Sequence, residues 1–215
     1  EAALGRIGVE IEPRKLWPAG LDAVGVPLKG RIPEEESARV GRALGRLTDI
    51  GWGLRLRDVV SPASPDAPIP EALLQAVVSV LGDWARSSEP WSAAAGEVAR
   101  PVGVVTIASR THPQLVGSLG EGIARAGRLP LLGRIERTDT GPHRPRAGNS
   151  AQRVREVYRA FALGAGLEES LSAAAGPILL VDDLVDSGWT MTLCARLLRR
   201  AGAPAALPLA LALQA

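Results

Sequence analysis

The run ILLVDDLVDSGWT at positions 178–190 constrains the fold of this chain more than any other stretch. Its first four residues are apolar and predict a buried strand, which delivers Asp182 and Asp183 to the carboxyl edge of a sheet. A short loop follows and leads into a helical pattern that begins at Met191. A buried strand, a loop and a helix in this order predict one unit of an α/β fold.

The remainder of the chain from position 69 shows the same alternation of strand and helix patterns. We predict further strands at 102–107, 131–135 and 207–211, and helices at 69–84, 113–126, 150–158 and 191–201. Strands that alternate with helices predict a mostly parallel sheet that helices cover on both faces.

A stretch rich in proline, SPASPDAP at 61–68, separates this region from the first 60 residues. We interpret 61–68 as a linker between a small α+β module at 1–60 and a larger domain at 69–215. Within the small module we predict strand-like pieces at 7–11 and 24–28 and a helical run at 34–47. A winged-helix-like arrangement is one interpretation of this module.

Composition excludes several classes of protein. Hydrophobic residues make up 46% of the chain and charged residues 22%, which is typical of a soluble globular protein, and no stretch is long and apolar enough to span a bilayer. The single cysteine, Cys194, excludes an intramolecular disulfide and a cysteine-rich zinc cluster. We therefore expect a cytoplasmic protein without a metal site, whose folding requires no cofactor.

The loop after the strand at 178–181 has the features of an anion site. Backbone N–H groups converge at the positive N-terminus of the following helix, and Ser187 and Thr190 add hydroxyl donors. Gly188 lets the backbone approach a phosphate closely. Two carboxylates beside a phosphate site match a ligand that has a phosphate at one end and a vicinal diol in its middle. Ribose 5-phosphate is such a ligand.

These residues resemble the phosphoribosyl-pyrophosphate motif of type I phosphoribosyltransferases. The resemblance implies that Asp182 and Asp183 hold the ribose hydroxyls and that Asp186, Ser187, Gly188, Trp189 and Thr190 hold the 5′-phosphate. It also makes Asp186 the candidate general acid or base, with a loop-capping role as the alternative. Trp189 departs from the family pattern, and its indole is expected either to stack on a base or to plug the site.

Two upstream segments resemble the competence-protein branch of the same family. VVTIASR at 104–110 is similar to the strand and loop that hold pyrophosphate, which makes Ser109, Arg110 and Thr111 the candidate contacts, although a plain surface turn is an equal alternative. The stretch 137–155 lies where the family has a mobile catalytic loop. Its arginines, which suit a pyrophosphate, a nucleic-acid backbone or plain solvation, are Arg137, Arg144, Arg146, Arg153 and Arg155. His143 in this loop is interpreted as incidental.

A narrower resemblance covers the whole chain. Four stretches are similar to the C-terminal region of those bacterial RecQ-like ATP-dependent DNA helicases that carry an appended domain with the type I phosphoribosyltransferase-like α/β fold: EPRKLWPAG at 12–20, GRALGRLTDIGWG at 41–53, SRTHP at 109–113 and VDDLVDSGWTMT at 181–192. The resemblance implies a parent protein that unwinds DNA in recombination and repair. A start at Glu1 is expected for a piece of such a polypeptide. With only Lys15 and Lys29, neither after a glycine, the chain has no Walker A loop for ATP and is not the motor.

Basic and aromatic residues alternate in the first module, as they do on nucleic-acid-binding surfaces. The candidate DNA contacts over the whole chain are Arg14, Lys15, Trp17, Arg144, Arg146, Arg153 and Arg155. For Trp17 and Trp52, a place in the core of a small module is the favoured alternative.

Two functions therefore remain after the sequence is considered. The preferred one is an accessory module, not itself catalytic, that contacts the helicase core and DNA and reuses the pocket for a nucleotide or another small phosphorylated ligand, for a DNA end or for a partner. The alternative is an active phosphoribosyltransferase in nucleotide salvage, which would use phosphoribosyl pyrophosphate together with Mg²⁺.

Overall fold

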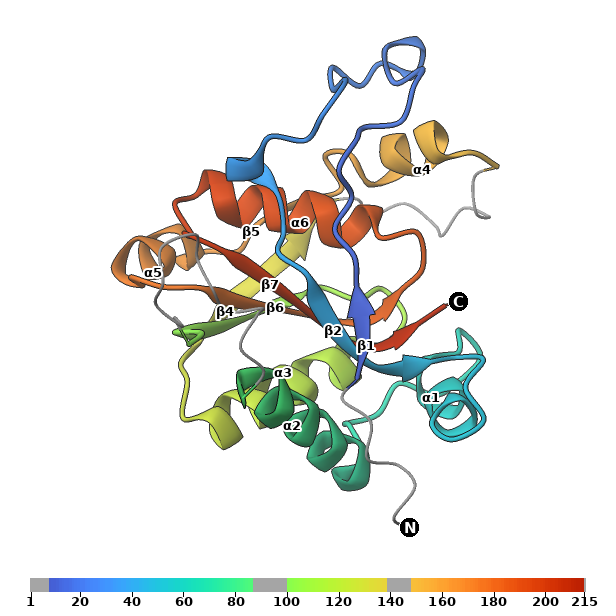
Figure 1. The fold of residues 1–215 in the computed structure, drawn as a ribbon, viewed down its shortest axis with the longest axis vertical. Coiled ribbons are helices and arrows are strands. Elements are labelled where there is room, and N and C mark those ends of the chain that lie inside the picture. The colour runs from blue at the N-terminus through green and yellow to red at the C-terminus, as the bar shows by residue number, and fades with distance from the viewer. Residues whose placement is uncertain (1–7, 87–99, 139–147, 215) are drawn as a thin grey trace.

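The computed structural model of the chain describes residues 8–86, 100–138 and 148–214 (Figure 1). Within these ranges one seven-stranded sheet has the order β1-β2-β7-β6-β3-β4-β5. The strands are β1 (Val9–Ile11), β2 (Gly41–Arg46), β3 (Gly103–Ile107), β4 (Leu131–Arg137), β5 (Phe161–Leu163), β6 (Ile178–Val185) and β7 (Ala206–Leu213). The helices are α1 (Gly53–Val60), α2 (Glu71–Arg86), α3 (Pro113–Gly127), α4 (Ser150–Val157), α5 (Leu167–Ala173) and α6 (Trp189–Arg200), with short 3-10 turns η2 (Asp22–Val24) and η3 (Glu34–Glu36).

The sheet is parallel at its centre and antiparallel at its two edges. β2, β7, β6, β3 and β4 pair in parallel, whereas β1 joins β2 and β5 joins β4 in the antiparallel sense. This arrangement confirms the α/β class that the sequence predicted. All four strands and all four helices predicted after position 68 are present, with shifts of a few residues at their ends.

Helices cover both faces of the sheet, as Figure 1 shows. α1, α2 and α3 pack on one face in a core cluster that includes Leu56, Val77 and Leu119. α5 and α6 pack on the other face with a cluster that includes Leu171 and Leu198. β6 contributes alternate residues to the two clusters, which explains why its first four positions are all apolar.

The structure differs from the expected division into two modules. β2 lies where the sequence predicted a helix at 34–47, and it pairs in parallel with β7, so residues 8–60 belong to the same sheet as the C-terminal strand. Gly41 makes this pairing possible, because a Cβ atom there would lie 2.4 Å from the carbonyl oxygen of Pro208. The winged-helix-like arrangement is therefore not found, and the expected strand at 24–28 is replaced by η2 and extended chain.

The chain between β1 and β2 makes a long excursion away from the sheet and lies beside α4 and α6 (Figure 1). We call residues 12–32 the cap segment. Its two ends are tied together, because the Trp17 N–H donates to the Gly30 carbonyl and the Ile32 N–H donates to the Lys15 carbonyl, both at 2.9 Å. Apolar side chains of the cap segment, α4 and α6 form a third buried cluster that the sequence did not predict.

The proposed linker at 61–68 is held against the larger part of the molecule. Asp66 accepts hydrogen bonds from the N–H groups of Gln114 and Leu115 at 3.0 and 3.2 Å and so caps the first turn of α3. The sequence also missed α1, α5 and β5, which are short. Among the described helices, none has the length and hydropathy needed to cross a membrane.

Candidate functional site

The predicted strand, loop and helix at 178–200 are present and meet at the carboxyl edge of the sheet. β6 ends at Val185, and α6 begins at Trp189, two residues earlier than the sequence predicted. Gly188 has a φ of 77° and caps α6, a conformation that a residue with a side chain adopts only under strain. The loop therefore leads straight into a helix N-terminus, the arrangement on which the predicted phosphate site depends.

A pocket of about 210 Å³ lies over this loop. Asp182 lines it together with the loop residues Asp186–Thr190, and Arg153 reaches it from α4. The Arg153 Nη1 atom lies 4.0 Å from Oδ2 of Asp186. The structure thus brings together in one pocket a buried acid and the candidate phosphate loop, which share one stretch of the sequence, and an arginine from a second stretch.

Asp182 carries a carboxyl group in an unfavourable place for a charge. It is 6% exposed. Burial raises the pKa of Asp182 well above its ordinary value, and the neighbouring charge of Asp183 raises this pKa further, whereas Arg137 lowers it. A ligand that brings hydroxyl donors or a cation to this carboxyl would relieve the unfavourable charge.

Asp183 is held by a different set of partners. It is 8% exposed, and its carboxylate accepts from the Ser109 hydroxyl at 3.2 Å and from the Leu184 N–H at 2.8 Å. The Nδ1 atom of His112 lies 3.3 Å from the same carboxylate. Two of these partners, Ser109 and His112, belong to the loop after β3. Asp183 therefore connects the candidate pyrophosphate loop to the strand that carries both acids.

His112 is the site residue that sequence reasoning missed. Its ring is 1% exposed, Nδ1 lies 3.0 Å from the Thr111 hydroxyl, and Nε2 is buried without a hydrogen-bond partner. The signal was present in the sequence, because His112 directly follows the three residues proposed for pyrophosphate and precedes the proline that opens α3. Only the contact with Asp183, which depends on the fold, shows that His112 belongs to the candidate site.

The candidate pyrophosphate loop lies beside the acid pair. Ser109 and Thr111 take part in the network around Asp183 and His112, and Arg110 is half-buried next to them. Arg137 ends β4 at the same edge, where its guanidinium lies over the ring of Phe161 at 4.6 Å. Arg137 thus brings a positive charge to the neighbourhood of Asp182.

Trp189 lines the pocket and packs against the cap segment. Its side chain is 3% exposed and stacks on Trp17 of the cap segment, with ring centroids 6.0 Å apart and an angle of 19° between the planes. Trp17 is itself 6% exposed. Both indoles therefore belong to the buried cluster beside the loop, in agreement with the core alternative that we favoured for Trp17.

The other candidate DNA contacts lie in three different settings. Lys15 and Arg155 are exposed, whereas two nitrogens of Arg14 donate to the Ser187 carbonyl. The remaining candidates, Arg144 and Arg146, lie outside the described residues, as does His143.

No cluster of three or more metal-ligating side chains occurs in the described parts of the chain. The acid pair nevertheless has the hard oxygen donors that Mg²⁺ prefers, and one or two carboxylates suffice for an ion that also binds the phosphates of its substrate. Asp182 and Asp183 are the residues that would hold such an ion.

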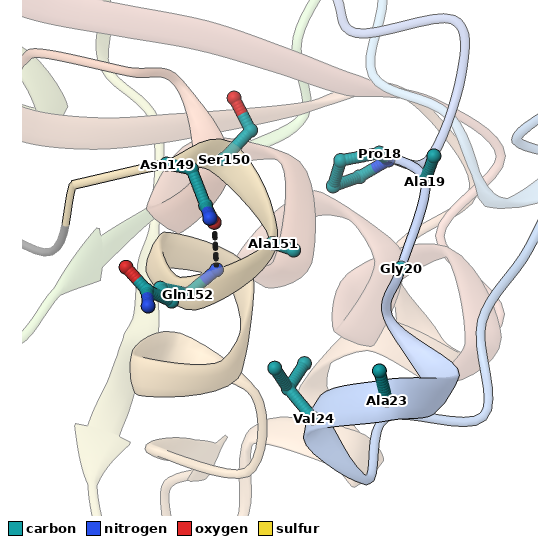
Figure 2. A pocket seen from close by; sticks show the side chains of 9 residues that line it. All are labelled: Pro18, Ala19, Gly20, Ala23, Val24, Asn149, Ser150, Ala151 and Gln152. Carbon is teal, nitrogen blue, oxygen red and sulfur yellow. Dashed lines mark hydrogen bonds between the residues drawn. The ribbon is translucent and has the colours of Figure 1, made fainter.

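A second, larger hollow of about 490 Å³ lies between the cap segment and the start of α4 (Figure 2). The side chain of Asn149 accepts from the Gln152 N–H at 2.9 Å and caps α4, as Figure 2 shows. The other residues that line this hollow are small or neutral, and none is charged. This hollow therefore has no charged side chain to pair with a phosphate.

No family model matches the chain, and no curated protein matches it either. The function of the site is therefore inferred from its geometry.

Proposed function

We propose that this chain is a phosphoribosyltransferase-like domain that binds a phosphorylated ribose at the carboxyl edge of its sheet. The observation that carries the proposal is the single pocket that contains both the buried Asp182 and the loop Asp186–Thr190. The helix N-terminus supplies N–H donors for a phosphate, and the carboxyl supplies an acceptor for a ribose hydroxyl. Phosphoribosyl pyrophosphate and nucleoside monophosphates share this chemistry.

We further propose that the domain serves as the C-terminal accessory part of a RecQ-like DNA helicase, whose core would be its main partner. Support comes from the way two of the resemblances meet in space. The stretch at 12–20, which resembles the helicase region, packs on the stretch at 186–190, which resembles the phosphate loop, through Trp17 and Trp189. The tryptophan that departs from the transferase pattern thus has its partner in the helicase-like stretch.

Isothermal titration of the whole chain with ribose 5-phosphate and with phosphoribosyl pyrophosphate, with and without Mg²⁺, tests the pocket. We expect saturable binding at one site that Asp182→Asn weakens about tenfold or more, the typical effect of losing one hydrogen bond to a charged group. Asp58→Asn, an exposed change on α1, is the matched control and should bind as the wild type does. Equal binding by wild type and Asp182→Asn would place the ligand elsewhere.

An active phosphoribosyltransferase is the second candidate, because Asp186 is exposed and lines the same pocket, where a proton donor or acceptor would be required. We expect little or no release of pyrophosphate from phosphoribosyl pyrophosphate with a panel of purine and pyrimidine bases. Robust release that is lost on Asp186→Asn would make transfer, rather than binding, the function of the site.

A further inference from the structure

The cap segment contacts the candidate phosphate loop through one charged side chain. The Nε and Nη2 atoms of Arg14 both donate to the carbonyl oxygen of Ser187, at 3.0 and 2.6 Å. The guanidinium also lies over the indole of Trp189, 5.1 Å from the ring centroid. A Cβ atom on Gly188 would lie 3.7 Å from Nε of Arg14, so the guanidinium lies directly against the middle of the loop.

This contact determines how one peptide group of the loop is oriented. In a trans peptide the C=O and the following N–H point in opposite directions. By binding the Ser187 carbonyl, Arg14 therefore turns the N–H of Gly188 away from itself. Gly188 is also the residue whose left-handed backbone begins α6, where a bound phosphate needs N–H donors.

The rest of the cap segment keeps Arg14 in this position. Trp17, three residues further on, is buried against Trp189, the residue that follows Gly188. The hydrogen bonds from the Trp17 N–H to Gly30 and from the Ile32 N–H to Lys15 close the segment into a loop with a fixed base. Arg14 is thus anchored beside the phosphate loop although its own side chain is exposed.

We propose that Arg14 is a positioning residue for the phosphate loop, which keeps the 187–188 peptide oriented so that the Gly188 N–H can bind the phosphate of the ligand. This inference rests on the proposed function of the pocket and adds a residue that lies far from the motif in sequence. It also gives Arg14 a role beside the phosphate loop instead of the DNA contact that the sequence suggested.

Calorimetric titration of ribose 5-phosphate into wild type and the variants Arg14→Gln, Arg14→Lys and Lys15→Gln tests the proposal. Arg14→Gln should weaken binding about tenfold or more, because it removes hydrogen bonds from a charged donor. Arg14→Lys keeps the charge but not the planar fork, so it should remain several-fold weaker than wild type. Lys15→Gln removes the same charge from an exposed neighbouring side chain and should change affinity by less than about twofold.

The amide resonance of Gly188 supplies a second readout. A general loss of stability would affect many resonances, whereas a change in this one peptide group affects the Gly188 resonance specifically. In ¹⁵N-labelled protein, inorganic phosphate should shift this resonance in the wild type and much less in Arg14→Gln. Circular dichroism should show that Arg14→Gln is still folded at the temperature of the titration, because the side chain of Arg14 is exposed. Wild-type protein that binds neither phosphate nor ribose 5-phosphate would overturn the function of the pocket and this inference together. The role of Arg14 alone would be overturned if Arg14→Gln or Arg14→Lys bound ribose 5-phosphate as tightly as the wild type does. It would also be overturned if Lys15→Gln lost as much affinity as Arg14→Gln.

Discussion

Replacing Asp182 by asparagine should make the protein more stable at neutral pH. Burial and the charge of Asp183 raise the pKa of Asp182 in the folded state above the value of 3.8 that applies to an ordinary aspartate. The folded protein therefore holds this proton more tightly than the unfolded chain does. The wild type loses stability as pH rises from about 4 through the raised pKa, at about 1.4 kcal/mol for each unit of elevation. An asparagine has no charge to bury and escapes this loss.

The stability difference between Asp182→Asn and wild type should consequently depend on pH. Near pH 4 the two proteins should have similar free energies of unfolding, and the advantage of the variant should grow as pH rises and then become constant. For a chain of this size, each kcal/mol corresponds to about 2–4 °C in Tm. Urea unfolding and calorimetry at several pH values between 4 and 8 measure the difference.

Asp183→Asn is the matched comparison for this experiment. Asp183 accepts hydrogen bonds from Ser109 and Leu184, and the amide nitrogen of an asparagine cannot replace a carboxylate oxygen in them. We therefore expect Asp183→Asn to lower the free energy of unfolding by about 1–3 kcal/mol. A variant Asp182→Asn that is less stable than wild type at pH 7.5, or a difference that does not change with pH, would refute the reasoning.

Three further predictions concern the sheet, the cap segment and DNA. Gly41→Val should unfold the protein or prevent its expression, because the new side chain would meet the Pro208 backbone, whereas Gly117→Ala, which has open space, should be tolerated in the same solubility assay. Trp17→Ala should lower the free energy of unfolding by about 3–5 kcal/mol in urea denaturation, since it empties a buried position against Trp189. Fluorescence anisotropy should detect weak DNA binding whose affinity falls steeply as the salt concentration rises. This salt dependence should become weaker in a variant that neutralises Arg144, Arg146, Arg153 and Arg155 together. An unchanged salt dependence in that variant would place the DNA contact elsewhere.

The predictions from sequence succeeded where a local pattern is sufficient. The run at 178–190 has apolar residues, acids and a glycine in the order that a strand, a loop and a helix require, and the structure places them so. The stretch at 34–47 was predicted to be a helix because its apolar residues suit one. Residues 41–46 instead form β2, because they pair with β7, and this pairing requires the close contact of Gly41 with the distant Pro208.

The parts of the site that sequence reasoning missed are contacts between distant residues. His112 meets Asp183, Arg14 meets the Ser187 carbonyl, and Trp17 meets Trp189 only because the sheet order brings their segments together. None of these pairs has a spacing that a motif could reveal. The acids and the loop were found because one short segment carries them all.

The position of β2 has a consequence for how the protein is made. Its partner β7 is the last strand of the described chain, and Arg42 pairs with Leu209. At ordinary rates of translation, β2 leaves the ribosome on the order of ten seconds before β7 does. During that interval its hydrogen-bonding edge toward β7 has no partner. Folding of the sheet is therefore completed only after synthesis of the C-terminal strand, and a nascent chain stalled before residue 206 would expose β2 to association with other chains.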